Sequence, residues 1–234
     1  MNIRVKFRKY GCLKFIGHLD VMRYFQKAMR RADMDMCYSE GFSPHMIMSF
    51  AAPLGVGLTS DGEYMDISVK SSPSSAEAVE RLNGVMAEGI DVISWRMLPE
   101  NSKNAMSIVA AADYEVRFRD GYELEEGWEG KFLSFLAQPE IRIVKETKKG
   151  QQEVDIRPWV YACDVKDGVI SLQVSTGSVH NLKPELLMQA FGQWLGTQIP
   201  ALTLLVHRKE IYADQGAEGN RRLVTLEALG EEIG

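Results

Sequence analysis

The sequence predicts an α+β fold built from two consecutive modules. Segments with the period-two alternation of strands alternate with segments that repeat apolar residues at the 3.6-residue period of an amphipathic helix. Their order along the first hundred residues is β-α-β-β-α-β, and the same order recurs in the second half. The chain has 234 residues, 45% hydrophobic and 25% charged, which suits one large or two small globular domains.

The first module is expected at residues 1–99. Its strands are predicted at residues 3–8, 46–51, 63–69 and 90–97, because these runs are apolar or alternate. Its helices are predicted at residues 18–33 and 74–86, where apolar residues share one face. Ser74 or Ser75 can cap the second helix, and Asp61-Gly62 indicates a turn before the third strand.

The second module is expected at residues 106–213, after a linker at 99–105. Its predicted elements are a strand at 107–118, a short helix around 128–136, hairpins at 140–157 and 159–175, a helix from Pro184 to Leu195 and a strand at 202–212. The hairpin turns are placed at Lys149-Gly150 and Asp167-Gly168. Residues 214–234 are expected to form a polar, acidic tail.

The β-α-β-β-α-β order is that of the ferredoxin-like fold. The sequence therefore predicts two tandem ferredoxin-like (βαββαβ) modules, and the second module carries an inserted hairpin.

Charge is distributed unevenly along the chain. Residues 1–58 carry nine Lys or Arg and four acidic residues, a net charge of +5, whereas the whole chain has a net charge of −5. Such a split suggests that the first segment meets an anionic partner. The alternative is that the basic segment faces acidic groups of its own chain.

Motifs for cofactors and metals are missing from the sequence. It has no P-loop, no GxGxxG after a strand, no HExxH and no CxxxCxxC, so we expect no cofactor and no iron–sulfur cluster. The cysteines, Cys12, Cys37 and Cys163, are odd in number and far apart, which favours a reduced, cytoplasmic protein. No apolar run reaches the roughly 20 residues that span a bilayer, so no membrane is expected as a partner.

A row of basic residues marks the first predicted helix. Arg23, Lys27, Arg30 and Arg31 follow one another at spacings that place all four opposite the apolar face. Such a row can neutralise phosphates without regard to base sequence. The alternative is a solvated helix face.

The segment YSEGFSPHMIMSF, residues 38–50, joins this helix to the next strand. Gly41 permits a backbone with φ > 0 or a close approach to a ligand, and Pro44 fixes its own φ. Phe42 is either a plug in the core, which we favour, or an exposed platform for a base. His45 is either a hydrogen-bonding residue at the strand end or a substrate-binding residue.

His18 and Asp20 begin the first helix in the motif GHLD. If the loop with His45 lay nearby, the three side chains would be candidate catalytic residues for RNA cleavage, or a weak candidate metal site. Asp20 is also explained by the helix dipole alone.

Arg157 belongs to the motif DIRP at residues 155–158. Its planar fork can hold a carboxylate or a phosphate, which makes it a candidate substrate-binding residue. The alternative, which we prefer, is an ion pair with a local acid such as Asp155.

Over residues 4–67 these motifs resemble the radical-SAM-linked proteins of the domain-of-unknown-function family 2344. The family pattern combines a Ser-His-Leu-Asp helix start, an Arg-rich helix and Gly-Phe-x-Pro-His-Pro. The matching residues are His18, Leu19, Asp20, Gly41, Phe42, Pro44 and His45. Gly17 stands where the family usually has serine, and Met46 where it usually has proline. The resemblance implies a bacterial cytoplasmic protein that works with a radical SAM protein.

Three functions are compatible with these observations. The leading hypothesis is a non-catalytic accessory protein that presents RNA, or another anionic substrate, to a radical SAM enzyme. Its substrate-binding residues would be Arg23, Lys27, Arg30, Arg31, Gly41, Phe42, His45 and Arg157. The alternative is an RNA-processing or RNA-modifying enzyme of tandem ferredoxin-like architecture that uses His18 and His45. A protein-interaction scaffold that binds no nucleic acid is the third.

Overall fold

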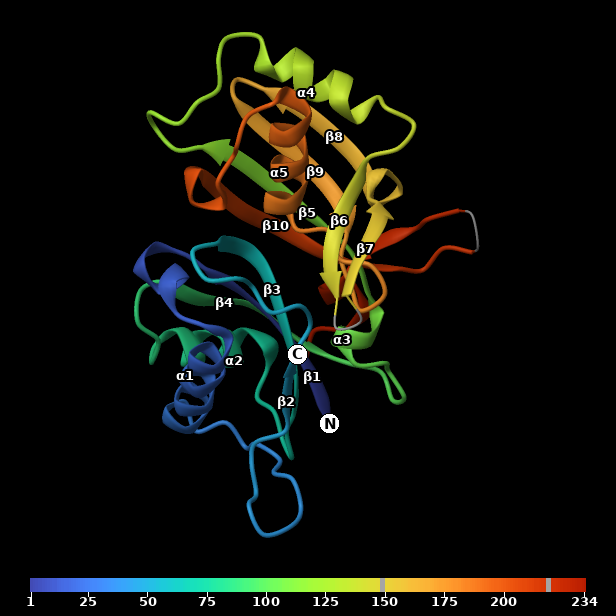
Figure 1. Cartoon of the computed structure of the whole chain (residues 1–234). Coiled ribbons are helices and arrows are strands. Elements are labelled where there is room, and N and C mark those ends of the chain that lie inside the picture. Colours follow the sequence, from blue (N-terminus) through green and yellow to red (C-terminus); the bar gives the residue numbers. More distant parts are fainter. Residues whose placement is uncertain (148–149, 218–219) are drawn as a thin grey trace. The chain divides into compact units, whose positions relative to one another are not determined.

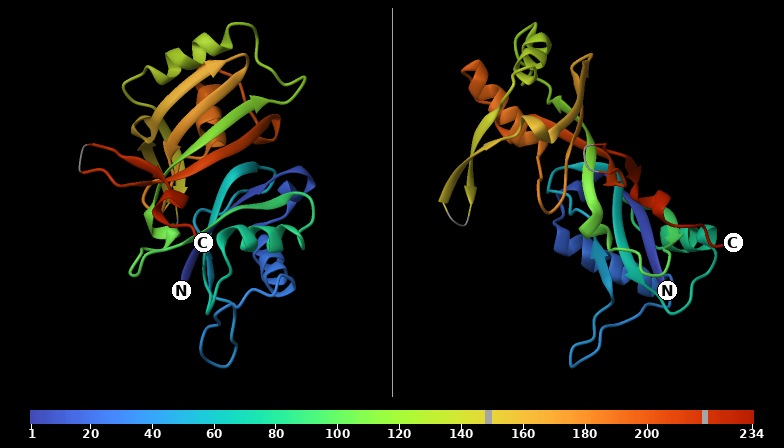
Figure 2. Two further views of the ribbon diagram at one scale, coloured as in Figure 1. Left: turned by 180° about the vertical axis from the view of Figure 1, so that it is seen from behind. Right: turned by 90° about the vertical axis from the view of Figure 1, so that its right-hand side faces the viewer.

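The computed structural model describes residues 1–147, 150–217 and 220–234. The chain forms two compact units. Unit 1 comprises Met1–Ala111 together with Arg208–Gly234, and unit 2 comprises Ala112–His207. Each unit combines helices with β-strands, which confirms the predicted α+β class (Figure 1, Figure 2).

Unit 1 contains the predicted β-α-β-β-α-β series. Its elements are β1 (Asn2–Lys9), α1 (His18–Arg31), β2 (Met48–Phe50), β3 (Thr59–Ser68), α2 (Ser75–Asn83), β4 (Ile90–Met97), α3 (Ala105–Ile108), β11 (Leu223–Thr225) and the short 3-10 helices η1 (Gly11–Phe15) and η4 (Leu226–Leu229). The side chain of Ser74 accepts a hydrogen bond from the backbone N–H of Glu77, so the predicted cap of α2 is confirmed.

The sheet of unit 1 is antiparallel around β1. Strand β1 lies between β4 and β3, and its Val5 faces Met65 on one side and Trp95 on the other. On the side away from β1, strand β3 pairs with β2 near one end and with β10 (Leu204–Asp214) near the other. The strand order β4-β1-β3-β2 therefore alternates in direction throughout.

The core of unit 1 lies between one face of this sheet and the two helices. Helix α1 contributes Val21, Phe25, Ala28 and Met29, and helix α2 contributes Ala78 and Leu82. Both helices lie on the same side of β1, β3 and β4 (Figure 1). The apolar stripe of each helix is thus buried, and its polar stripe is left to solvent.

Gly62 does not form the predicted turn, because Asp61 and Gly62 lie within β3. A Cβ atom at position 62 would lie 2.7 Å from the backbone oxygen of Lys209 on β10. This glycine is therefore explained by the close approach of a neighbouring strand.

Unit 2 follows the predicted order with its extra hairpin. Its elements are β5 (Val109–Phe118), α4 (Trp128–Leu136), β6 (Arg142–Thr147), β7 (Gly150–Asp155), η2 (Arg157–Trp159), β8 (Val160–Lys166), β9 (Val169–Ser175), α5 (Pro184–Leu195) and η3 (Ala201–Thr203), before β10. The strand order is β10-β5-β9-β8, and β6 and β7 form a separate two-stranded sheet. Asp167 and Gly168 both have positive φ, as the predicted hairpin turn requires. Lys149, of the other predicted turn, lies outside the described residues.

The C-terminal segment is more structured than its composition predicts. Strand β11 pairs with β10, and Leu226 in η4 is completely buried. Further on, Glu231 exchanges two backbone hydrogen bonds of 2.8 Å with Met97, at the edge of β4. These residues belong to unit 1, whereas the sequence-based boundaries set residues 214–234 apart.

Candidate functional site

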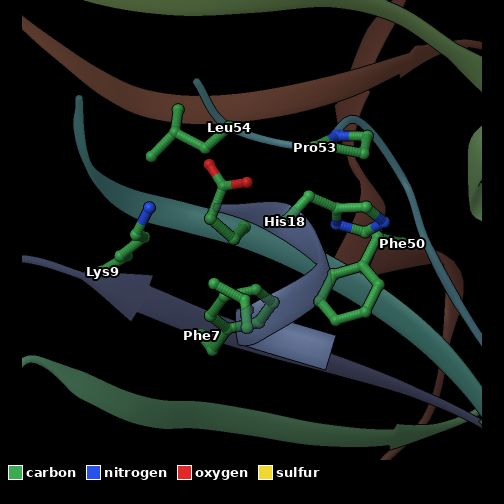
Figure 3. A pocket seen from close by; sticks show the side chains of 8 residues that line it. Phe7, Lys9, His18, Phe50, Pro53 and Leu54 are labelled. Carbon is green, nitrogen blue, oxygen red and sulfur yellow. The ribbon is translucent and has the colours of Figure 1, made fainter. Parts of the chain in front are cut away.

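His18 begins α1 and lies beside a small cavity in unit 1. Its ring meets the ring of Phe50 edge-on, with the ring centres 4.9 Å apart. Lys9 from the end of β1 and Glu63 from β3 line the same cavity (Figure 3). Its volume is about 10 Å³, which is room for about one water molecule.

The charged groups around this cavity are buried and mutually satisfied. The Glu63 carboxylate accepts two hydrogen bonds from Arg208 of β10, at 2.7 and 2.5 Å. The Lys9 ammonium group donates to the backbone oxygen of Ile16 at 2.9 Å. Burial lowers the pKa of Lys9, and the positive Arg208 lowers it further, against the opposing effect of Glu63.

This arrangement gives a fixed polar cluster with no space for a substrate. The planar guanidinium of Arg208 holds Glu63 in one orientation. A carboxylate fixed in this way stabilises the fold and is not available to a substrate. We therefore treat the cavity as part of the scaffold that positions the start of α1.

The structure does not bring His18, Asp20 and His45 together. His45 is five residues from Phe50 along an extended stretch, a separation of about 16 Å, whereas His18 touches Phe50. The helix between His18 and the connecting loop is about 21 Å long, because its 14 residues each add about 1.5 Å. The prediction that the helix start lies near this loop is wrong, because it is the end of α1 that leads into it.

The candidate metal site and the candidate acid–base pair fail for the same reason. Among the described residues no group of three His, Cys, Asp or Glu side chains could hold a metal ion. Asp20 is exposed and pairs with Arg23 on the next turn of α1, at 3.4 Å. The enzyme hypothesis that joined His18 to His45 therefore loses its catalytic pair.

His45 closes the neck of a projecting loop, residues 39–45, which we call the GFSPH loop. Its Nδ1 lies 2.8 Å from the hydroxyl of Ser39, and its backbone N–H donates to the same hydroxyl. The backbone N–H of Ser39 donates in return to the His45 carbonyl. These bonds hold the two ends of the loop together, and the segment extends away from the sheet (Figure 1, light blue).

Phe42 is fully exposed at the end of this loop. The preferred expectation that it plugs the core is wrong, because the loop projects into solvent and offers no apolar neighbour in the described structure. Gly41 has φ of +105°, as predicted for a backbone region that favours glycine. The sharp turn at Gly41 therefore presents an aromatic ring on a closed loop.

Most basic residues of the first segment lie on β1 or on α1. Those on β1 are used within unit 1: Arg4 pairs with Asp66 at 2.8 Å, Lys6 with Glu210 and Glu227 at 2.7 Å each, and Arg8 with Asp91 at 2.6 Å. Burial lowers the pKa of Lys6, but its hydrogen bonds to the two glutamates outweigh burial and raise it. For β1 the alternative explanation, pairing with acids of the same chain, is thus the right one.

The basic residues of α1 remain at the surface. Arg23, Lys27, Arg30 and Arg31 are all exposed, as their spacing predicts. Within the described part of the chain only Arg23 of these four makes an ion pair. Three cations of this row are therefore available to an anionic partner.

The end of this row adjoins a groove of about 560 Å³. Arg30 lines it from α1, Tyr38 and Met46 line it from the neck of the GFSPH loop, and Lys70 lines it after β3. The basic helix and the loop thus share one surface of unit 1.

Arg157 lies in unit 2, in the short helix η2. Its guanidinium donates to the backbone oxygen of Val160 at 3.2 Å, and its backbone N–H donates to Asp155 at 3.0 Å. The interaction with Asp155 therefore runs through the backbone of Arg157, and the expected ion pair between the two side chains is not formed.

Several residues of these clusters were not found from the sequence. Glu63, Arg208, Glu210 and Glu227 lie far along the chain from their partners, and no local pattern marks them. Lys9 did carry a signal, because a lysine at an inward position of an alternating strand must find buried acceptors.

No helix in the described ranges has the length and apolar character needed to cross a bilayer. A search among curated proteins found no match. Among solved structures, the chain is similar to one in a crystal structure of a Cbf5-Nop10-Gar1 complex, with 10% identity and a TM-score of 0.47. The similarity covers 89% of this chain and about half, 48%, of that chain.

The family comparison is more extensive. The model of a family described as "Uncharacterized protein conserved in bacteria (DUF2344)" matches residues 2–184. This range includes the GHLD helix start, the basic face of α1, the GFSPH loop and the DIRP motif. The chain therefore belongs to the DUF2344 family.

Proposed function

We propose that the protein is a non-catalytic, cytoplasmic accessory protein that binds RNA on unit 1 and presents it to a radical SAM enzyme. The binding surface comprises the basic face of α1 and the GFSPH loop. Its residues are Arg23, Lys27, Arg30, Arg31, Gly41, Phe42 and His45.

One observation carries the RNA part of this proposal. Three cations without ion pairs in the described residues lie on α1, and the loop beside the end of that helix exposes an entire phenylalanine ring. Single-stranded nucleic acids are bound by this combination, in which cations follow the backbone and aromatic rings stack on bases. A solvated helix face explains the cations but not the exposed Phe42.

The proposed architecture is two tandem ferredoxin-like modules. In unit 1 the strand order β4-β1-β3-β2 supports it, and in unit 2 the order β10-β5-β9-β8 does so once the β6–β7 hairpin is set aside as an insertion. The proposed modules keep the boundaries 1–99 and 106–213.

Replacing Lys27, Arg30 and Arg31 together by alanine should weaken RNA binding on the order of tenfold or more at low salt. Each lost phosphate contact should also flatten the dependence of log K on log salt by about 0.7. Fluorescence polarisation with a labelled single-stranded RNA decamer, at several salt concentrations, measures both quantities.

The matched control replaces Arg81, Arg117 and Lys131 by alanine, which changes the net charge equally but leaves α1 intact. The control should bind as the wild type does. Equal losses in both variants would mean that only net charge matters, and absence of RNA binding by the wild type at low salt would refute the RNA part. Phe42→Ala should weaken binding without changing the salt dependence, because stacking displaces no counterions.

The radical SAM partner rests on the resemblance of the family motifs. Co-expression with the radical SAM protein encoded nearest to it should yield a complex that survives nuclease treatment. A complex that disappears with nuclease would mean that RNA alone connects the two proteins, and no complex at all would refute this part of the proposal.

A further inference from the structure

We infer that the groove at the end of α1 is a guanine-binding subsite; this inference rests on the proposed function, because it assigns one nucleotide of the bound RNA to a place on unit 1. The groove has a volume of about 560 Å³, within the range of ordinary small-ligand sites. Its walls combine the three kinds of group that a nucleotide needs.

The first kind is a surface for the base. Tyr38 lines the groove and is 44% exposed, and its aromatic ring is the kind of group on which a base stacks. The floor beneath is apolar, because Met34 and Met46 line the groove and are buried. The groove therefore offers both an exposed aromatic ring and apolar side chains to a planar base.

The second kind is a pair of cations. Arg30 lines the groove and makes no ion pair in the described part of the chain, and Lys70 lines it at 4.0 Å from Asp35. Lys27 and Arg31, on the same face of α1, extend the positive surface beyond the groove. The groove lining thus supplies two cations to the phosphates that flank a bound nucleotide.

The third kind is a carboxylate without a partner, and it decides which base is read. Asp35 is engaged, since it accepts a hydrogen bond of 2.9 Å from Ser71. Asp33 lines the groove, and its side chain makes no hydrogen bond or ion pair among the described residues. A carboxylate can only accept hydrogen bonds, so it selects a base with donors.

Guanine fits this requirement better than the other bases. Its N1–H and its exocyclic N2 amine are adjacent donors, which one carboxylate can accept together in a two-pronged interaction. Cytosine and adenine each place an acceptor nitrogen beside their amine, and uracil flanks its single N–H with two carbonyl oxygens. The Watson–Crick edge is available because single-stranded RNA exposes it.

Asp33 also occupies an unusual backbone position. It follows the end of α1 with φ of +51°, where helices commonly place glycine. The backbone N–H of the next residue, Met34, donates to Met29, which fixes the direction in which the chain leaves the helix. Asp33 is therefore held at a defined point of the groove wall.

The experiment compares oligoadenosine decamers that carry one central guanosine, inosine or adenosine. The wild-type chain should bind the guanosine decamer about tenfold more tightly than the adenosine decamer. The inosine decamer, which lacks the N2 amine, should lie between them. Asp33→Asn should bind all three alike, because it removes the charged acceptor while asparagine tolerates the same backbone conformation.

The matched control is Glu80→Gln, which removes one negative charge from the exposed side of α2, outside the groove and the proposed RNA surface, and should keep the guanosine preference. Equal binding of guanosine and adenosine decamers by the wild type, or a preference that survives in Asp33→Asn, would overturn this inference and leave the RNA proposal intact. Failure of every decamer to bind would overturn both. Titration with GMP separates the two sources of guanine: GMP bound as tightly as the guanosine decamer would identify a free nucleotide as the ligand and overturn its assignment to RNA.

Discussion

Replacing Arg208 by methionine should lower the free energy of unfolding by about 3–5 kcal/mol, one of the two largest effects expected of a single substitution in this chain. Arg208 and Glu63 are both buried, and two hydrogen bonds of 2.7 and 2.5 Å join them. Without the guanidinium, the Glu63 carboxylate would remain in the interior without its counter-charge. The midpoint of urea unfolding, followed by circular dichroism, measures the loss, and hydrogen exchange within β3 locates it.

Two further variants separate burial from pairing. Arg8→Met removes an arginine from an ion pair at the surface, because the Arg8 side chain that pairs with Asp91 is 47% exposed. This substitution should lower the free energy of unfolding by less than about 1 kcal/mol. The double variant Glu63→Leu, Arg208→Met should recover most of the stability, because the pair is replaced by apolar groups of similar size. If Arg208→Met cost no more than Arg8→Met, the pair would not be buried in solution.

The elements of unit 1 could be predicted from the sequence, whereas its ion pairs could not. The strand and helix patterns of unit 1 depend on neighbouring residues, and β1, α1, α2 and β4 lie within a few residues of their predicted bounds. Arg4, Lys6 and Arg8 alternate on β1 with apolar residues, so the local pattern made them appear to be solvent-exposed charges. Their partners are 62 to 221 residues away, and only the folded sheet brings them together.

The candidate site was also predicted only where local sequence patterns determine it. The exposure of the basic face of α1 follows from helical spacing and was predicted correctly. The exposure of Phe42 depends on whether the GFSPH loop folds back or projects, and hydrogen bonds between Ser39 and His45 decide this. The expected convergence of His18 and His45 failed because His18 begins α1, whereas the loop with His45 follows the end of this 14-residue helix.

The C-terminal segment is the clearest case of a structure that its composition conceals. Its residues are polar and acidic, which is typical of a solvent-exposed tail. Its main anchor is one apolar side chain, Leu226, which is completely buried. Lys6 of β1 donates to Glu227 at 2.7 Å, and Arg4 donates to the backbone oxygen of Leu226 at 3.2 Å. The segment therefore covers the polar face of β1 and supplies acceptors to two of its cations.

Replacing Leu226 by alanine should accordingly lower the free energy of unfolding by about 2–5 kcal/mol, as expected for a leucine whose side chain is entirely buried. The loss combines the transfer of apolar surface to water with the cavity that remains, since the sheet beneath cannot collapse into it. Urea unfolding again measures the change. Hydrogen exchange in β1 should rise, because η4 packs against that strand.

Leu19→Ala is the matched control, because Leu19 is 59% exposed on α1 and its truncation removes the same atoms. It should change stability by no more than about 0.5 kcal/mol. If the two variants were equally stable, residues 226–234 would be the loosely attached tail that their composition predicts, and Lys6 would have Glu210 as its principal partner. If Leu226→Ala is the more costly change, unit 1 requires its last residues to complete the sheet face opposite its helices, and a chain truncated after β10 should be markedly less stable.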